Sequence, residues 1–247
     1  MLFLGDKKYI LCEQWEYDKH KGRIVYIEVL KDGFSEPRPS FEPPYHVAFP
    51  YTIEYDGHVY CVPESTQTRQ ISLYEIDGSP DRWRKISTLV SDCRCADPAI
   101  IQYSGEWWLF STWGGKYAAS NLFIWHSSSL LGPWVPHECN PISRDMRPSR
   151  SAGTPFVVDG VLYRPTQDCS RGYGSAVSIN RVVELSSKRF VEERAIDVPP
   201  YSSPYSEGLH TMSSARDRTL LDGRHGIFSL RAFGYGVIDA WKKRKRI

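Results

Sequence analysis

Apolar and polar residues alternate along most of this chain in short runs that end at Gly, Pro or Asp. Residues 49–64 contain a Pro-led apolar run, the turn Asp56-Gly57 and a second, aromatic run, and residues 97–112 repeat this arrangement around Ser104-Gly105. Period-two alternation indicates strands, and a two-residue turn ending in Gly favours a tight antiparallel hairpin. The pattern therefore predicts β-hairpins rather than helices.

The hairpin pattern recurs at nearly even intervals. A third copy occupies residues 154–167, and an abbreviated copy occupies residues 2–13. The aromatic residues at equivalent positions are Tyr9, Tyr60, Trp108 and Tyr163, so that the spacings are 51, 48 and 55 residues. Repeats of this length in β-rich sequence are typical of propeller blades or solenoids.

The segments after each hairpin favour blades. Alternating runs follow at residues 22–27, 70–74, 121–125 and 175–179, and short fourth segments follow at 83–86 and 133–136. Four antiparallel strands per repeat is the composition of a propeller blade. Repeats of about 50 residues leave room for five blades in 247 residues.

The fifth blade is expected from residues 208–212, 219–223 and 226–230, with Asp222-Gly223 as its hairpin turn. We therefore predict an all-β, five-bladed β-propeller over residues 1–240, followed by a basic tail at 241–247. A proline opens the second and third copies ten residues before the aromatic anchor, and the equivalent position before Tyr9 falls outside the chain. Either the first inner strand is shortened, or residues that precede Met1 in relatives are missing.

Composition narrows the class of protein. Apolar residues make 41% and aromatic residues 13% of the chain, and the formal net charge is +2, which indicates no general polyanion partner. We expect no nucleic-acid partner, and no apolar run approaches the ~18 residues that span a bilayer. The absence of a visible signal peptide favours the cytoplasm. The oligomeric state stays open.

Six cysteines are present without a zinc-binding spacing, because Cys93-Arg94-Cys95 is too tight for the usual two-residue gap. We expect buried, reduced thiols that behave as small apolar residues, and neither a metal nor another cofactor.

Polar residues fall at the position four residues after each aromatic anchor. These positions hold Glu13, Glu64, Thr112 and Gln167. The inner strands of a propeller surround a central channel, so that equivalent positions become neighbours. With Asp97 and His210 at the heads of later repeats and Asp168 beside Gln167, we expect six of these polar side chains to share one cavity; they are Glu13, Glu64, Asp97, Gln167, Asp168 and His210.

Convergent carboxylates among aromatic residues are what glycoside cleavage requires: one protonated acid, one base or nucleophile, and flat surfaces for sugar rings. Structural roles stay open for each residue. Glu13 and Glu64 can accept backbone N–H bonds or pair with arginine, and Asp97 can start a strand before Pro98. Arg150 can pin loops through a carboxylate or clamp an anionic sugar. Asp168 and His210 can be turn and core residues.

Several segments resemble a known family. They are Val62-Pro63-Glu64-Ser65, Ala96-Asp97-Pro98, Trp107-Trp108-Leu109-Phe110, Gln167-Asp168-Cys169-Ser170, Tyr173-Gly174 and Gly208-Leu209-His210-Thr211. The chain resembles the N-terminal propeller domain of glucosamine inositolphosphorylceramide transferases and of related bacterial proteins. That domain is similar to the five-bladed propellers of glycoside hydrolase families 43, 32 and 68.

The resemblance implies a carbohydrate-facing propeller with inward acidic residues from successive blades. In the hydrolases the catalytic base is an Asp in the opening strand of the first blade, and the equivalent position here falls before Met1. In the transferases the sugar-transfer reaction belongs to a separate C-terminal domain. The resemblance therefore leaves catalysis open.

Two functions follow. The first is glycosidase-like processing of a glycan or glycoconjugate, with Glu64 as acid or nucleophile, Asp97 tuning its pKa, and Glu13 or Asp168 as second carboxylate. Substrate contacts are then expected from four further residues, Arg150, Gln167, Tyr173 and His210. The second is a non-catalytic glycan-binding module that accompanies a glycosyltransferase or a polysaccharide-assembly system. In both cases the partner is a carbohydrate or glycoconjugate.

Overall fold

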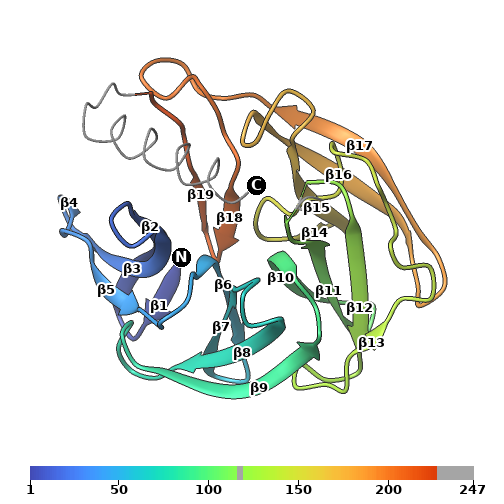
Figure 1. Ribbon diagram of the computed structural model, residues 1–247, viewed down its shortest axis with the longest axis horizontal. Helices are drawn as coiled ribbons and strands as arrows, with labels where there is room; N and C mark the ends of the chain where they lie inside the picture. The colour runs from blue at the N-terminus through green and yellow to red at the C-terminus, as the bar shows by residue number, and fades with distance from the viewer. Residues whose placement is uncertain (116–118, 227–247) are drawn as a thin grey trace, which may run out of the picture.

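The computed structural model describes residues 1–115 and 119–226, and its regular elements there are antiparallel strands. The strands form separate sheets that are arranged around a common centre, with β9, β13 and β17 at the periphery (Figure 1). Within each sheet, strands that are consecutive in sequence pair with one another, except that β5 pairs with β3 rather than with β4. This arrangement is an all-β propeller, as the repeats predict.

Four sheets have four or five strands each and are the blades. Blade 1 consists of β1 (Leu2–Leu4), β2 (Lys7–Glu16), β3 (Lys21–Leu30), β4 (Gly33–Phe34) and β5 (Arg38–Phe41). Blade 2 consists of β6 (Ala48–Tyr55), β7 (His58–Glu64), β8 (Gln70–Ile76) and β9 (Trp83–Ser91). Blade 3 consists of β10 (Cys95–Tyr103), β11 (Glu106–Trp113), β12 (Leu122–Ser127) and β13 (Val135–Pro136). Blade 4 consists of β14 (Phe156–Val158), β15 (Val161–Asp168), β16 (Ala176–Leu185) and β17 (Phe190–Val198).

The register of the inner hairpin is the same in all four blades. Each aromatic anchor pairs with the residue seven positions earlier, and the pairs are Leu2 with Tyr9, Ile53 with Tyr60, Ile101 with Trp108, and Phe156 with Tyr163. In three blades the turn residues have positive φ at both positions, as in Asp56 (51°) and Gly57 (75°). That geometry matches the twist of the flanking strands. The predicted repeat is confirmed at the level of individual residue pairs.

The hydrophobic core lies between neighbouring blades. Side chains of blades 1 and 2 pack together around Ile24 and Val47, those of blades 2 and 3 around Leu73 and Leu109, and those of blades 3 and 4 around Phe110. Because both faces of a blade are covered in this way, its strands carry apolar residues on both sides. This explains why the middle repeats are so rich in aromatic residues.

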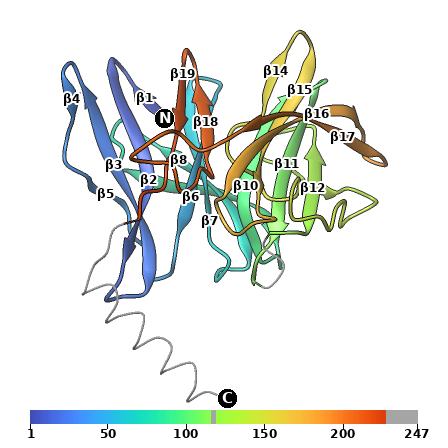
Figure 2. The same cartoon turned by 90° about the horizontal axis from the view of Figure 1, so that it is seen from above.

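A two-stranded sheet follows blade 4. It consists of β18 (Met212–Ala215) and β19 (Arg218–Leu221), and it lies between blade 4 and the start of the chain (Figures 1 and 2). The described residues therefore form four blades and one hairpin, whereas five blades were expected.

The hairpin of β18 and β19 turns at Arg216-Asp217. The turn predicted at Asp222-Gly223 would lead from β19 into the third expected strand, so that it stays a prediction. Asp222 lies at the base of the hairpin, where its Oδ1 accepts the backbone N–H groups of His210 (2.9 Å) and Thr211 (2.7 Å). Most of the third strand expected at 226–230, and the tail at 241–247, lie outside the described residues.

The cysteines are free, and Cys61, Cys93, Cys95 and Cys169 are buried as expected. Cys139 is exposed and Cys12 is half-buried, so burial was wrong for the former and incomplete for the latter. In the part of the chain that the structure describes, no helix is long and apolar enough to cross a bilayer.

Candidate functional site

Polar side chains from every blade and from the segment before β18 interact with one another. We call this set the central cluster; its members are Glu13 on β2, Glu64 on β7, Asp97 on β10, Arg150 before β14, Gln167 on β15, Tyr173 between β15 and β16, and His210 before β18. Eight residues were expected to form the site, and six of them contact one another by hydrogen bonds, ion pairs or ring contacts. A seventh, Glu13, is near enough for the charges of Asp97, His210 and Arg150 to shift its pKa. Asp168 is the exception.

Asp97 occupies a β-bulge. Its φ is 48°, and the pairing of β10 with β11 shifts between Ala96 and Ala99. Blade 2 has the same irregularity at Phe49, where φ is 41° and Pro50 follows. A positive φ is uncommon for residues other than Gly, and bulges redirect side chains. The backbone of the inner strand is thus shaped to present Asp97.

Three groups hold Asp97. Its carboxylate forms an ion pair with Nε of Arg150 and accepts a hydrogen bond of 3.0 Å from Nε2 of Gln167. Its backbone N–H donates to Oε2 of Glu64 at 3.0 Å. The Asp97 side chain is only 5% exposed, so that the pair with Arg150 is shielded from solvent. The charge of Asp97 is thus compensated inside the protein by a neighbouring cation, as buried charges require.

Arg150 is fixed by the neighbouring strand. Its carbonyl oxygen accepts the backbone N–H of Gln167 at 2.9 Å, so that the segment before β14 runs alongside β15. Nε2 of Gln167 also donates to the carbonyl oxygen of Ser151 at 2.9 Å. Arg150 and Gln167 therefore approach Asp97 together from blade 4.

Glu64 holds its proton more tightly than an ordinary carboxyl. Burial raises its pKa well above the usual range, and the negative charge of Asp97 raises it further, while Arg150 offsets part of the effect. The residue is only 8% exposed. A neutral carboxyl at this position is able to donate a proton near neutral pH.

Glu13 has a related environment from blade 1. Burial is the largest cause that raises its pKa, the charge of Asp97 adds to it, and His210 and Arg150 oppose the shift. Its carboxylate fills the space beside Gly22, where a Cβ would also meet the carbonyl oxygen of Val47 at 2.7 Å. Glu13 is therefore positioned by a glycine on the paired strand.

Tyr173 and His210 form the aromatic side of the cluster. The guanidinium carbon of Arg150 lies 4.9 Å from the Tyr173 ring centroid, and that ring meets His210 edge-on at 5.3 Å. Nδ1 of His210 contacts the carboxylate of Asp222. Although burial opposes it, hydrogen bonding from His210 lowers the pKa of Asp222. Asp222 thus orients the histidine, a role that the sequence did not indicate because the residue looked like part of a turn.

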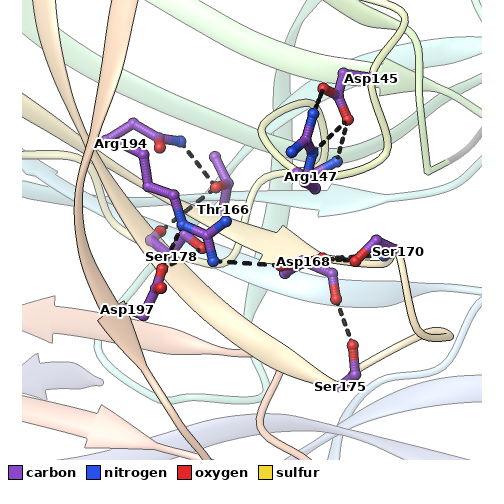
Figure 3. A network of polar contacts seen from close by, with 10 residues as sticks. Asp145, Arg147, Thr166, Asp168, Ser170, Ser175, Ser178, Arg194 and Asp197 are labelled. Atoms are coloured by element: carbon purple, nitrogen blue, oxygen red, sulfur yellow. Dashed lines mark hydrogen bonds and ion pairs between the residues drawn. The ribbon is translucent and has the colours of Figure 1, made fainter.

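Asp168 lies apart from the central cluster. Its carboxylate accepts hydrogen bonds from the Ser170 hydroxyl (2.6 Å) and backbone N–H (3.0 Å), and pairs with Arg194 on β17 at 3.4 Å (Figure 3). Successive residues of a strand point to opposite faces, so Asp168 faces away from the side that Gln167 occupies. No hydrogen bond or ion pair among the described residues joins Asp168 to the central cluster, and its place in the shared cavity stays a prediction.

The cluster combines two protonatable carboxyls, a shielded ion pair and exposed aromatic surface. Such a set can donate a proton to a leaving oxygen and contact sugar hydroxyls. Among the described residues no group of three His, Cys, Asp or Glu side chains is arranged to hold a metal ion. The functional groups of the central cluster are carboxyls, a guanidinium, an amide, a phenol and an imidazole.

Comparison with solved structures defines the class. A thermostable family-43 glycoside hydrolase superposes with a TM-score of 0.57 at 17% identity, over 82% of this chain and 76% of that one. The likeness is one of fold. The protein is therefore a β-propeller that shares its fold with this hydrolase.

Sequence comparison defines the family. The chain belongs to the family described as "Glucosamine inositolphosphorylceramide transferase 1, N-terminal", which matches residues 33–222. Glucosamine inositolphosphorylceramide transferase 1 of Arabidopsis thaliana is 33% identical over 219 residues, which cover 86% of this chain and 28% of the plant protein. The protein of the same name from Oryza sativa subsp. japonica is 34% identical over 195 residues, which cover 76% of this chain and 26% of the rice protein. The resemblance seen in the sequence is confirmed, and the chain spans about a quarter of the length of these relatives.

Proposed function

We propose that this propeller processes a glycan or glycoconjugate by glycosidase-like chemistry in the central cluster. The observation that carries the proposal is the pairing of Glu64, whose pKa is raised well above its usual range, with Asp97, which Arg150 shields and holds. Glycoside cleavage needs one carboxyl that stays protonated and a second carboxylate as base or nucleophile. A carbohydrate substrate is in keeping with the family to which the chain belongs.

Each residue has a role in this proposal. Glu64 donates the proton to the leaving oxygen, and the charge of Asp97 keeps that proton in place. Glu13, rather than Asp97, is the second carboxylate, which acts as the base or the nucleophile. The substrate contacts come from Arg150, Gln167, Tyr173 and His210, and Asp168 has no part in them because its carboxylate is held by Ser170 and Arg194.

The test is Glu64→Gln, which keeps the shape and the hydrogen bond from Asp97 but removes the transferable proton. Release of the leaving group from a broad panel of aryl glycosides and natural oligosaccharides is measured for wild type and variant. We expect wild type to turn over at least one substrate, and the variant to lose turnover while its affinity for that substrate changes less than about threefold, within one neutral hydrogen bond. No turnover by wild type on any member of the panel contradicts the enzyme proposal.

A second candidate is a non-catalytic glycan-binding module. It is favoured by the way Asp97 is committed to Arg150 and Gln167, contacts that serve rigidity as well as catalysis. This proposal expects wild type to retain glycans on an array without hydrolysing them. The variants Arg150→Met and His210→Ala are then expected to lose glycan binding on the array. Glu64→Gln is expected to show no loss of hydrolysis, because wild type hydrolyses nothing.

We also propose that β18 and β19 are the inner half of a fifth blade. Leu209 packs with Ala152 and Val177 of the blade 4 side, as side chains of neighbouring blades do elsewhere in the ring. A hairpin that ends at β19 leaves a strand edge to be paired or covered. An experimental structure in which no further strand pairs with β19 contradicts this proposal.

A further inference from the structure

A second recess lies away from the central cluster, between blades 1 and 2. We call it the interblade pocket; it has a volume of about 180 Å³. It is lined by residues of β5, β7, β8 and β9, of the segment that leads into β6, and of the loop between β7 and β8. A cavity of about 150 Å³ admits a benzene molecule. The interblade pocket therefore has room for one six-membered ring.

Aromatic side chains form part of its wall. The ring centroids of Phe41 and Tyr74 are 5.0 Å apart, and burial together with the neighbouring Tyr45 side chain raises the pKa of the Tyr74 hydroxyl. All three line the pocket. Flat rings with a hydroxyl at the edge suit the apolar face and the polar rim of a sugar ring.

Ser65 supplies an unsatisfied polar group. It lines the pocket, is only 8% exposed, and its buried Oγ has no hydrogen-bond partner among the described residues. A buried hydroxyl without a partner is costly, so the Ser65 hydroxyl is available to hydrogen-bond a ligand hydroxyl. Thr68, Gln70 and Ser72 add further hydroxyl and amide groups to the lining. This polarity favours a polyol over a purely apolar ring.

The interblade pocket is separate from the central cluster although both use β7. Pro63 and Ser65 line the pocket, and Glu64 between them belongs to the cluster. Successive side chains of an extended chain point to opposite faces, so Pro63 on β7 and Ser65 just after it point away from the side that Glu64 occupies. A ligand in the pocket does not compete with one at the cluster for the same side chains.

The positive charge of Lys85 favours a ligand ring that carries a negatively charged substituent. Lys85 lines the pocket, and Nζ donates to Oε1 of Gln70 at 3.2 Å. The pocket-lining residues include no Asp or Glu, and no carboxylate of the described residues pairs with Lys85. A lysine whose partner is a neutral amide retains an uncompensated charge, which attracts an anion.

We propose that the interblade pocket binds a single sugar ring that carries one anionic substituent, a carboxylate or a phosphate. The aromatic wall contacts the ring face, Ser65 bonds to a ring hydroxyl, and Lys85 contacts the anion. Binding in the interblade pocket does not require catalysis in the central cluster. The two proposals can therefore be tested independently.

The test is calorimetric titration of the full chain with D-glucuronate, D-glucose 6-phosphate and D-glucose. We expect at least one anionic sugar to bind about tenfold more tightly than glucose, and the comparison of the two anions shows whether a carboxylate or a phosphate is preferred. Lys85→Met, at an exposed position, removes that tenfold difference. Ser65→Ala weakens binding of all three sugars about threefold or more, because one hydrogen bond is lost.

Two control variants distinguish binding in the pocket from binding at the outer surface or at the central cluster. Lys31→Met removes an exposed charge at the tip of blade 1 and leaves all affinities unchanged. Glu64→Gln changes the central cluster and also leaves them unchanged. Equal affinity for glucose and both anions, no binding at millimolar concentrations, an unaltered Lys85→Met variant, or loss of binding in Glu64→Gln each overturns the proposal.

Discussion

The backbone N–H of Asp97 donates to the Glu64 carboxylate at 3.0 Å, so that the main chain of blade 3 contacts a side chain of blade 2. The contact exists because a bulge before Pro98 turns the backbone at Asp97. It brings two carboxyl groups together in a shielded place, where one charge opposes the other. The protonation of Glu64 is thus coupled to the backbone geometry of the next blade.

We expect the unfolding free energy to depend on pH through the protonation of Glu64. The folded-state pKa of Glu64 is raised above its unfolded value of about 4.3. The stabilising contribution of Glu64 is therefore fully present below about pH 4.3 and is lost as the pH rises through the folded pKa. Relative to Glu64→Gln, wild type is expected to lose up to about 1.4 kcal/mol of unfolding free energy per pH unit across that window.

Urea unfolding at steps of half a pH unit measures this difference. Glu36→Gln, at an exposed position in blade 1, is the matched control. A difference between wild type and Glu64→Gln that stays constant from pH 4 to 8 is incompatible with the raised pKa.

Arg150→Met removes the cation from a shielded pair. The variant leaves Asp97, with a side chain only 5% exposed, without its charge partner, which costs about 3–5 kcal/mol of unfolding free energy. Adding Asp97→Asn to Arg150→Met is expected to restore part of that loss, because no uncompensated charge then remains. Denaturant melts of the single and double variants measure the coupling, and strictly additive losses would show that the two residues act independently.

Gly22→Ala tests how Glu13 is positioned. A Cβ at residue 22 meets the Glu13 carboxylate and lies 2.7 Å from the carbonyl oxygen of Val47. We expect a loss of about 1–3 kcal/mol in unfolding free energy from overpacking, together with weaker ligand binding at the central cluster. Adding Glu13→Ala relieves only the side-chain part of the clash, so partial recovery of stability is expected without recovery of binding. A Gly22→Ala protein with unchanged melting and binding would mean that Glu13 moves freely.

Asp168→Asn separates Asp168 from the central cluster. Its partner Arg194 has a side chain 44% exposed, so the loss of the ion pair costs only about 1 kcal/mol or less. Ligand affinity and any turnover are expected to stay within about twofold of wild type, within the same small energy. Asp97→Asn serves as the comparison, because it removes the carboxylate that binds Arg150 and Gln167. Loss of ligand binding in Asp168→Asn would return that residue to the site.

The repeats made much of this site predictable. Glu13, Glu64 and Gln167 occupy the same position in three copies of one hairpin, and a ring of blades turns equivalent positions into neighbours. Asp168 is less certain from the sequence. It follows Gln167 directly, and successive side chains of a strand point to opposite faces.

Other features depend on conformations that residue types do not specify. The left-handed backbone at Asp97, with φ of 48°, recurs at Phe49, which has a quite different side chain. Asp222 precedes a glycine and therefore resembles a turn residue, yet it binds two backbone N–H groups and His210. These roles arise from tertiary contacts between segments.

The hairpin β18–β19 touches both ends of the ring. The carbonyl oxygen of Met212 accepts the backbone N–H of Thr154 beside blade 4 at 3.2 Å. From the turn of the same hairpin, Arg216 lies 4.2 Å from the Phe3 ring centroid of blade 1 and bonds to Glu54 of blade 2 at 3.0 Å, across 162 residues of sequence.

Contacts between such distant parts of a chain form slowly, because loop-closure entropy opposes them until most of the structure is in place. Blades 2 and 3 can assemble from local hairpins, whereas His210 reaches its partners only when the last hairpin docks. Ligand affinity should therefore appear late during refolding, after most of the β-sheet signal has already formed.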